Sequence, residues 1–356
     1  MKVLVTGATG LVGCHIVRAL LRRGHSVRAL HRPSSNCSAL DGLPVELVQG
    51  DVLAPHSLEP AVNGCELVFH AAADFAYWGK SRGELQATAV SGTANVLTAA
   101  AAAGAGRVVV TSSSIVLGYS RTPSIRNEES PALDDVSTPY DESKLQQDSR
   151  ALEIANALGL DLVLACPTVV VGPFAPALGP SNAVLTTYLA DPMRLTYPGG
   201  CNVVAAADVG EGHVLAATAG RSGERYILGS ENLEWRDIHR MVSELCGTYG
   251  PLTTANHTTC YLAALGEEIG ATLSNRVPRT TRVQARMVGR YYWYGHEKAA
   301  ALGFSPGSAR DAIRGALSWL VTTGHVSRET RARLRLASDV WSARSALRAS
   351  EAALRS

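Results

Sequence analysis

The stretch Val3-Leu4-Val5-Thr6-Gly7-Ala8-Thr9-Gly10-Leu11-Val12-Gly13 decides the fold, because it predicts a buried strand that leads directly into a helix. Residues 2–6 form a short aliphatic run with valine at alternate positions, which is typical of a strand. Residues 11–23 carry apolar side chains over one broad side, which is typical of a helix packed on a sheet. The chain therefore opens as an α/β protein.

Three glycines, Gly7, Gly10 and Gly13, occupy the turn between this strand and this helix. They allow a tight turn, a close approach of a diphosphate to the backbone, and close packing of helix on strand. Free amides and the positive end of the helix dipole would face the phosphates. A glycine triplet alone is a weak signal, but its place between strand and helix predicts dinucleotide binding. The residues expected to make these contacts are Gly7, Thr9, Gly10, Leu11, Val12 and Gly13.

The composition narrows the class of protein. A chain of 356 residues can form one large α/β domain with an appendage, or two small domains. The net charge of +2 gives no indication of nucleic acid or an anionic membrane as a partner. The seven cysteines are scattered, which argues against a disulfide framework and against a metal site. With no apolar run of about 18 residues and no room for a signal peptide, we expect a cytoplasmic protein.

The preference between NAD and NADP is set at the end of the second predicted strand, residues 26–30, where the ribose 2′ position would lie. An NAD site would carry Asp or Glu there, but this chain has His31-Arg32-Pro33-Ser34-Ser35. Arg32 can pair with a 2′-phosphate, so the sequence favours NADP over NAD. The alternative is that Arg32 is a solvated loop cation.

Two further predicted strands, residues 45–49 and 66–70, end beside the expected cofactor. Asp51, just past the first, can accept from the adenine amino group or cap the next turn. His70 has apolar neighbours and is expected to be a structural histidine rather than a catalytic one. The small residues Ala71, Ala72 and Ala73 suit a backbone that passes close to the cofactor.

An aromatic loop, Asp74-Phe75-Ala76-Tyr77-Trp78, follows at the edge where open α/β sheets bind substrates. Phe75, Tyr77 and Trp78 could line a pocket for an apolar substrate, which we favour, or could pack on their own domain. A long Ala-rich helix over residues 85–103 and a strand over residues 107–111 are expected next.

The catalytic candidates come after that strand, which ends in Thr111-Ser112-Ser113-Ser114. Tyr140 and Lys144 are four residues apart, so they lie on one face of a helix. A phenol with a pKa of about 10 is a poor acid or base at neutral pH, and an adjacent ammonium stabilises its phenolate. The lysine can also hold the nicotinamide ribose, and a serine from the strand end can hydrogen-bond the substrate oxygen.

With these residues together, the chain resembles an extended short-chain dehydrogenase/reductase over roughly residues 1–324. The resemblance implies a Rossmann-type doubly wound parallel sheet over residues 1–172, to which later segments return, and a smaller substrate-binding lobe mainly over residues 173–324. The motifs that carry it are Gly7/Gly10/Gly13, Asp51-Val52, His70-Ala71-Ala72-Ala73, Thr111-Ser112-Ser113, Tyr140/Lys144 and Pro167-Thr168-Val169-Val170-Val171-Gly172-Pro173.

Within that family the chain looks most like the dihydroflavonol 4-reductase branch and the hopanoid-associated sugar epimerase-like proteins. The resemblance implies that Ser113, rather than Ser112 or Ser114, is the catalytic serine, and that Pro167 and Val170 lie against the nicotinamide. It implies that Ser181 reaches the cofactor phosphates. Cofactor contacts are also expected from Asp51, Val52, Ala71, Ala72, Ala73 and Ser112, and a substrate contact from Ser114.

Two departures bear on the substrate. Relatives often carry Asn where this chain has Ala89, and many sugar-modifying members carry Asn or Arg where it has Cys166. Both departures weaken the interpretation that the substrate is a sugar nucleotide, and both leave the resemblance to reductases intact.

The second half is less regular. We expect a strand over residues 160–166, a helix opening at Asp208, which would cap it, a strand over residues 225–228 and a helix over residues 235–246. Tyr291-Tyr292-Trp293-Tyr294 is expected to pack in the core.

Residues 325–356 fall outside the resemblance and predict a terminal helix with a thin apolar seam. This helix could pack on its own domain, mediate a homodimer, or fray. The seam consists of Leu336, Val340, Ala343, Leu347, Ser350 and Leu354.

Three functions remain open from the sequence. The leading one is NADPH-dependent reduction of a ketone or aldehyde on a moderately apolar small molecule, plausibly in specialised metabolism, by Ser113, Tyr140 and Lys144. The second is a sugar or sugar-nucleotide epimerase that retains NAD. The third, a nucleotide-sensing regulator without chemistry, has no reason to keep this catalytic spacing.

Overall fold

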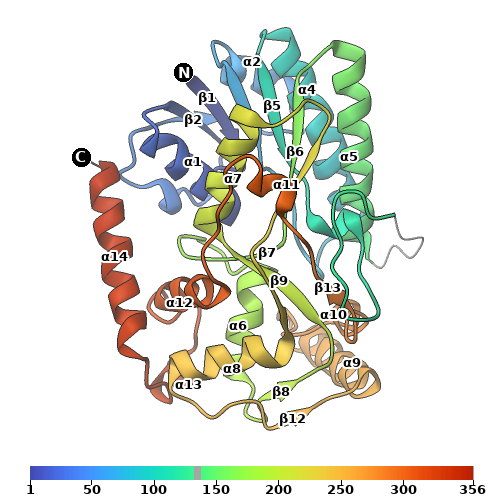
Figure 1. The fold of residues 1–356 in the computed structure, drawn as a ribbon, viewed down its shortest axis with the longest axis vertical. Coiled ribbons are helices and arrows are strands. Elements are labelled where there is room, and N and C mark those ends of the chain that lie inside the picture. The colour runs from blue at the N-terminus through green and yellow to red at the C-terminus, as the bar shows by residue number, and fades with distance from the viewer. Residues whose placement is uncertain (132–137, 356) are drawn as a thin grey trace.

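The computed structural model describes residues 1–131 and 138–355. Its upper half is a sheet of seven parallel strands in the order β10-β6-β5-β4-β1-β2-β3 (Figure 1). The strand order reverses after β3, so β1 and β4 are neighbours although β2 and β3 lie between them in sequence. The strands are β1 (Lys2–Thr6), β2 (Ser26–His31), β3 (Val45–Gln49), β4 (Leu67–His70), β5 (Arg107–Thr111), β6 (Leu162–Pro167) and β10 (Arg225–Leu228).

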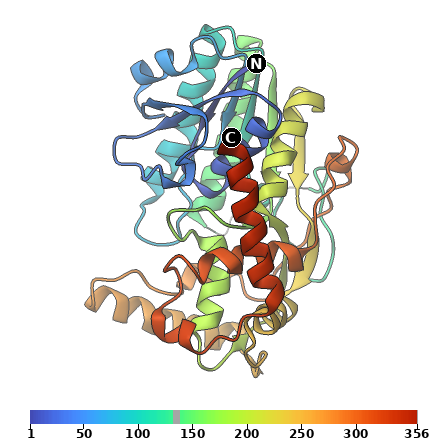
Figure 2. The same ribbon diagram turned by 90° about the vertical axis from the view of Figure 1, so that its left-hand side faces the viewer.

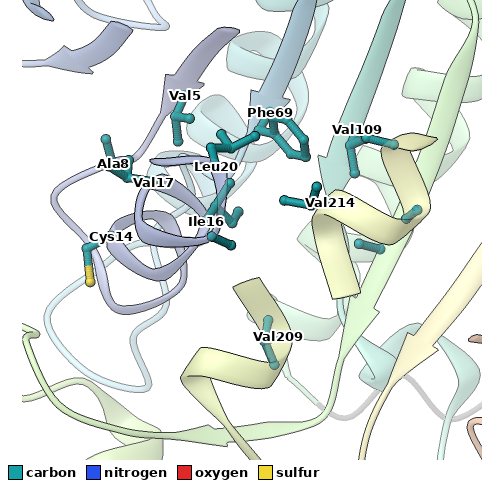
Figure 3. Packing of buried hydrophobic residues seen from close by; sticks show 14 of the residues in the cluster. Val5, Ala8, Cys14, Ile16, Val17, Leu20, Phe69, Val109, Val209 and Val214 are labelled. Carbon is teal, nitrogen blue, oxygen red and sulfur yellow. The ribbon is translucent and has the colours of Figure 1, made fainter. Parts of the chain in front are cut away.

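Helices cover both faces of this sheet, which confirms the predicted doubly wound α/β fold. On one face, α1 (Leu11–Arg22) and α7 (Ala206–Ala219) pack against each other and against the strands. Figure 3 shows Ile16 and Val17 of α1 near Val5 and Phe69 of the sheet, with Val214 of α7 beyond them. The other face is covered by α2 (Leu58–Val62), α4 (Gly92–Ala102) and α5 (Pro139–Leu158).

The lower half is a smaller lobe with its own apolar core. A four-stranded sheet forms from β7 (Val169–Val171), β9 (Gly200–Ala205), β11 (Glu231–Glu234) and β13 (Tyr291–Tyr292), and β8 (Leu195–Thr196) pairs with β12 (Thr253–Thr254). The lobe helices are α6 (Pro180–Ala190), α8 (Trp235–Cys246), α9 (His257–Leu273), α10 (Arg282–Ala285), α12 (Ala309–Leu320) and α13 (Arg328–Ala332). Helix α11 (Glu297–Ala300) packs instead beside β10 of the seven-stranded sheet. Tyr292 and Tyr294 are buried, as expected for core aromatics.

The expected helix over residues 85–103 is confirmed as one helical run made of α3 (Arg82–Gln86), a π-helical turn over Ala87–Ser91, and α4. An Ala-rich run has the same apolar pattern in both kinds of turn, so the sequence does not reveal the π turn. One local prediction is wrong. Asp208 does not cap α7, whose N-cap is Ala205; its carboxylate accepts instead from the Gly307 amide at 2.9 Å.

The terminal helix α14 (Ser338–Arg355) packs on its own chain. Figure 2 shows it running from the lower lobe to the sheet domain. Val340 near its start is buried in the lobe core, and Leu354 near its end packs on the sheet-domain core. Ser350, in the predicted seam, is exposed. No helix within the described ranges has both the length and the apolar character that crossing a membrane requires.

Candidate active site

The glycine turn has the shape that a diphosphate requires. Gly7 has φ +66°, and a Cβ there would lie 2.5 Å from the Ala71 carbonyl carbon; a Cβ on Gly13 would lie 2.1 Å from the Gly7 oxygen. Any side chain would therefore push β1, α1 and the chain after β4 apart. The N-cap of helix α1 is Gly10, which offers no side-chain cap, and the first turn has no acidic residue, so the amides and dipole of the helix remain available to an anion. These features fit a dinucleotide held by the backbone of residues 7–13.

Three residues predicted to contact the cofactor lie just beyond the ends of strands β2 and β3. Arg32, beyond β2, is exposed, and within the described part of the chain no partner of its guanidinium is found. Asp51 does cap the following turn, since one carboxylate oxygen accepts from the Leu53 amide at 2.9 Å. Val52 is buried, and its carbonyl accepts from Asn95.

Tyr140 is placed by the start of α5. The Thr138 hydroxyl is the N-cap, accepting from the Asp141 amide at 3.1 Å, and Pro139 supplies the first helical residue with its fixed φ. Tyr140 is thereby the second residue of the helix, with Lys144 one turn further. Ser113, at the end of β5, caps a short turn over Ser114–Leu117. The structure brings Ser113 and Tyr140 within hydrogen-bonding reach.

Burial dominates the electrostatics of these groups. It raises the pKa of the Tyr140 phenol, while the hydrogen bond with Ser113 opposes that rise. It also lowers the pKa of the Lys144 ammonium to about 8. Lys144 is 2% exposed, and its ammonium donates to the Thr111 carbonyl at 3.0 Å and to Gln147 Oε1 at 2.8 Å.

Gln147 begins a buried chain of hydrogen bonds that the sequence did not predict. Its Nε2 donates to Thr93 Oγ1 at 2.9 Å, and Thr93 Oγ1 lies 2.9 Å from His70 Nε2. The Thr93 hydroxyl can then donate to His70, and a neutral His70 can donate from Nδ1 to Thr6 Oγ1 at 2.7 Å. Burial, with a smaller contribution from Lys144, lowers the pKa of His70 to about 3 and keeps it neutral. His70 is a structural histidine, as expected.

Behind Lys144 lies a second buried group. Asp148, one turn along α5, binds the Arg225 guanidinium at 3.1 Å, and burial raises its pKa. The predicted cofactor residue Ser112 is 3% exposed, with its side chain against Asp148 and Cys166. Ser114 is also buried, beside Tyr294.

The aromatic loop covers Tyr140. The Phe75 ring lies 4.4 Å from the Tyr140 ring at 32°, and Tyr77 packs edge-on against Phe75 at 5.2 Å. Trp78 lies further out and is 38% exposed. This arrangement gives the candidate catalytic phenol an apolar wall.

The remaining residues expected to contact the cofactor divide between two places. Pro167 ends β6, and Val170 is buried in β7, which continues from that strand. Ser181 instead lines a cavity of about 10 Å³ among apolar lobe side chains that include Val171 and Ile313.

Comparison with known proteins supports the same classification. Residues 3–229 match the model of the NAD dependent epimerase/dehydratase family. A Synechocystis protein provisionally named a dihydroflavonol 4-reductase is 33% identical over 329 residues, covering 90% of this chain and 95% of its own. Sterol demethylase protein B of Methylococcus capsulatus is 31% identical, covering 92% and 100%.

A reductase and a solved structure extend the comparison. The 2-alkyl-3-oxoalkanoate reductase of Stenotrophomonas maltophilia is 30% identical, covering 84% of this chain and 92% of its own. The crystal structure of gox2253 superposes with a TM-score of 0.81 at 34% identity, covering 92% and 99%. The matched family, the glycine turn and the seven-stranded sheet agree: the chain belongs to the NAD dependent epimerase/dehydratase family and is an NAD(P)-dependent oxidoreductase of the extended short-chain dehydrogenase/reductase type.

Proposed function

We propose that this enzyme reduces a ketone or aldehyde on a moderately apolar small molecule, in specialised metabolism, with NADPH as the preferred reductant. The observation that carries the proposal is the approach of Ser113 to Tyr140 under the apolar wall of Phe75 and Tyr77, with Lys144 one helical turn beyond Tyr140. Relatives named as reductases of carbonyl compounds support it.

Each group has a role in the proposed reaction. The backbone of residues 7–13 would hold the dinucleotide, whose nicotinamide would supply the hydride for the carbonyl carbon. Tyr140 donates its proton to the carbonyl oxygen, and Ser113 donates a hydrogen bond to that oxygen as negative charge develops on it. The Lys144 ammonium stabilises the phenolate that remains, and solvent returns the proton. The same groups run the reverse alcohol oxidation.

The role of Tyr140 predicts a large effect of one hydroxyl group. Tyr140→Phe should lower kcat by a factor of about 100 or more, because the general acid is lost. NADPH affinity should be unchanged, since the ring remains. Steady-state kinetics after a screen of carbonyl compounds, combined with NADPH titration, measures both quantities. Full activity in this variant would remove Tyr140 from the mechanism.

Cofactor preference is tested at Arg32. A guanidinium–phosphate contact is worth about 1.5–3 kcal/mol, so Arg32→Glu should weaken NADPH binding about 10-fold or more and leave NADH binding unweakened. Arg328→Glu, an exposed arginine at the start of α13, is the matched control. Equal or tighter binding of NADH by the wild type would contradict the preference. Copurified stoichiometric NAD, without consumption of NADPH, would favour an epimerase.

A further inference from the structure

An apolar groove of about 240 Å³ lies between the aromatic loop and helix α9, at the end of the lobe where α9 and α10 lie side by side (Figure 1). Trp78 comes from the loop, and Leu265, Ile269 and Leu273 come from α9. We propose that this groove binds a hydrocarbon tail of the substrate whose carbonyl group is held at Tyr140. The inference rests on the proposed function and specifies its substrate class: a ketone or aldehyde with a long, uncharged alkyl or terpenoid chain.

The aromatic loop connects the groove with the candidate catalytic phenol. Phe75 packs on Tyr140, Tyr77 packs on Phe75, and Trp78 follows immediately in the chain. Three residues of extended backbone span at most about 11 Å, so the groove begins within that reach of Phe75. A substrate lying along these rings would leave its carbonyl at Tyr140 and carry its far end over Trp78.

The polar groups at the groove are already engaged with one another. Arg282 donates to both oxygens of Glu268, from Nε at 2.6 Å and from its backbone amide at 2.7 Å. The Thr272 hydroxyl donates to the Glu268 carbonyl at 2.8 Å. Glu268 and Thr272 are thereby engaged within the protein, and the rest of the lining is mainly the apolar side chains of Trp78, Leu265, Ile269 and Leu273. The groove chemistry therefore selects an apolar chain.

The side chains of this wall are unusually exposed for their type. Ile269 is 53% exposed and Leu273 is 83% exposed, on the side of α9 that faces Trp78. Apolar side chains grouped around a groove in this way provide a surface that an apolar ligand chain can cover. Leu262, on the same helix and 60% exposed, does not line the groove and so provides a matched control.

The test is a series of methyl ketones from butan-2-one to dodecan-2-one, each below its aggregation concentration, with NADPH. We expect kcat/KM to rise by up to about fourfold for each methylene that enters the groove, and then to level off. Ile269→Ser and Leu273→Ser should flatten this rise and leave butan-2-one unaffected, while Leu262→Ser should behave as wild type. Calorimetric binding of dodecan-2-one to the NADPH-saturated enzyme gives a second readout that needs no turnover.

The outcomes separate the two proposals. If butan-2-one is reduced and chain length has no effect, the groove proposal is wrong and the reductase proposal stands. If dodecan-2-one binds, loses affinity in Ile269→Ser and is never reduced, the groove proposal stands and the reductase proposal falls. Two results would assign this face of α9 to another occupant and overturn the inference. The first is a wild-type dimer, seen by sedimentation, that is lost in Ile269→Ser and Leu273→Ser. The second is wild-type binding to phosphatidylcholine vesicles that is lost in Ile269→Ser, Leu273→Ser and Leu262→Ser.

Discussion

At the scale of single residues, Gln147 accepts one of the hydrogen bonds that the buried Lys144 ammonium donates. A buried ammonium needs acceptors, and Lys144 has the Thr111 carbonyl and Gln147 Oε1. Removing one acceptor destabilises the charged form, so Gln147→Ala should lower the pKa of Lys144 further below about 8. A hydrogen bond to a charged group is worth about 1.5–3 kcal/mol, so the fall should be about 1–2 pH units. Because the proposed mechanism needs a charged lysine to stabilise the Tyr140 phenolate, the alkaline limb of the kcat–pH profile should move to lower pH by that amount.

The neighbouring glutamine offers the control. Gln146 is exposed and bonds only weakly to Glu142, at 3.4 Å, so Gln146→Ala should leave the profile in place. A Gln147→Ala enzyme with reduced thermal stability and an unmoved alkaline limb would show that Gln147 is merely structural.

At the scale of elements, helix α14 joins the two halves through one buried ion pair. Arg18 of α1 binds both oxygens of Glu351 at 2.6 Å, and its side chain is 4% exposed. Glu351→Ala would leave that guanidinium without its counter-ion, which should lower the free energy of unfolding by about 3 kcal/mol. Glu329→Ala, which removes an exposed pair with Arg333, should cost less than about 0.5 kcal/mol. Urea unfolding measures both, and equal effects would mean that α14 does not depend on this pair.

The same scale shows what the sequence can predict. Strands β1 to β6 and helix α1 follow from local periodicity, and Tyr140 and Lys144 from spacing on one helix, because these signals lie within a few residues. The Gln147–Thr93–His70 chain joins α5, α4 and β4, so only the packing of three elements reveals it. The local sequence signal for this hydrogen-bond chain is the position of Gln147, three residues after Lys144. The groove likewise joins Trp78 to α9, nearly two hundred positions later. The position of α14 depends on the ion pair between Arg18 and Glu351, and the apolar seam of the helix gives no indication of that pair.

At the scale of the whole molecule, four buried histidines couple folding to pH. His15 in α1, His70 in β4, His213 in α7 and His239 in α8 belong to both halves of the protein. Burial lowers their pKa values to about 3, 3, 4 and 3 respectively, from 6.5. Burial holds each of them neutral, and each has a hydrogen-bond partner in the interior, such as the Pro173 carbonyl for His15 and the Thr196 hydroxyl for His239.

These shifts predict acid instability well above the pH at which carboxylates titrate. Below pH 6.5 the unfolded chain binds protons that the folded protein rejects, so stability is full above that pH and falls as pH drops towards about 3–4. From pH 6 to pH 5, each histidine should cost about 1.2 kcal/mol and the four together about 5 kcal/mol. Asp148 and Asp208 act in the opposite direction, because burial raises their pKa values. Urea unfolding at pH 6 and pH 5 measures the change in the free energy of unfolding between these pH values. His239→Asn should reduce this change by about a quarter. His56→Gln, at an exposed site, should leave it as it is in the wild type. A stability that stays flat between pH 6 and pH 5 would mean that these histidines are protonated in the folded protein.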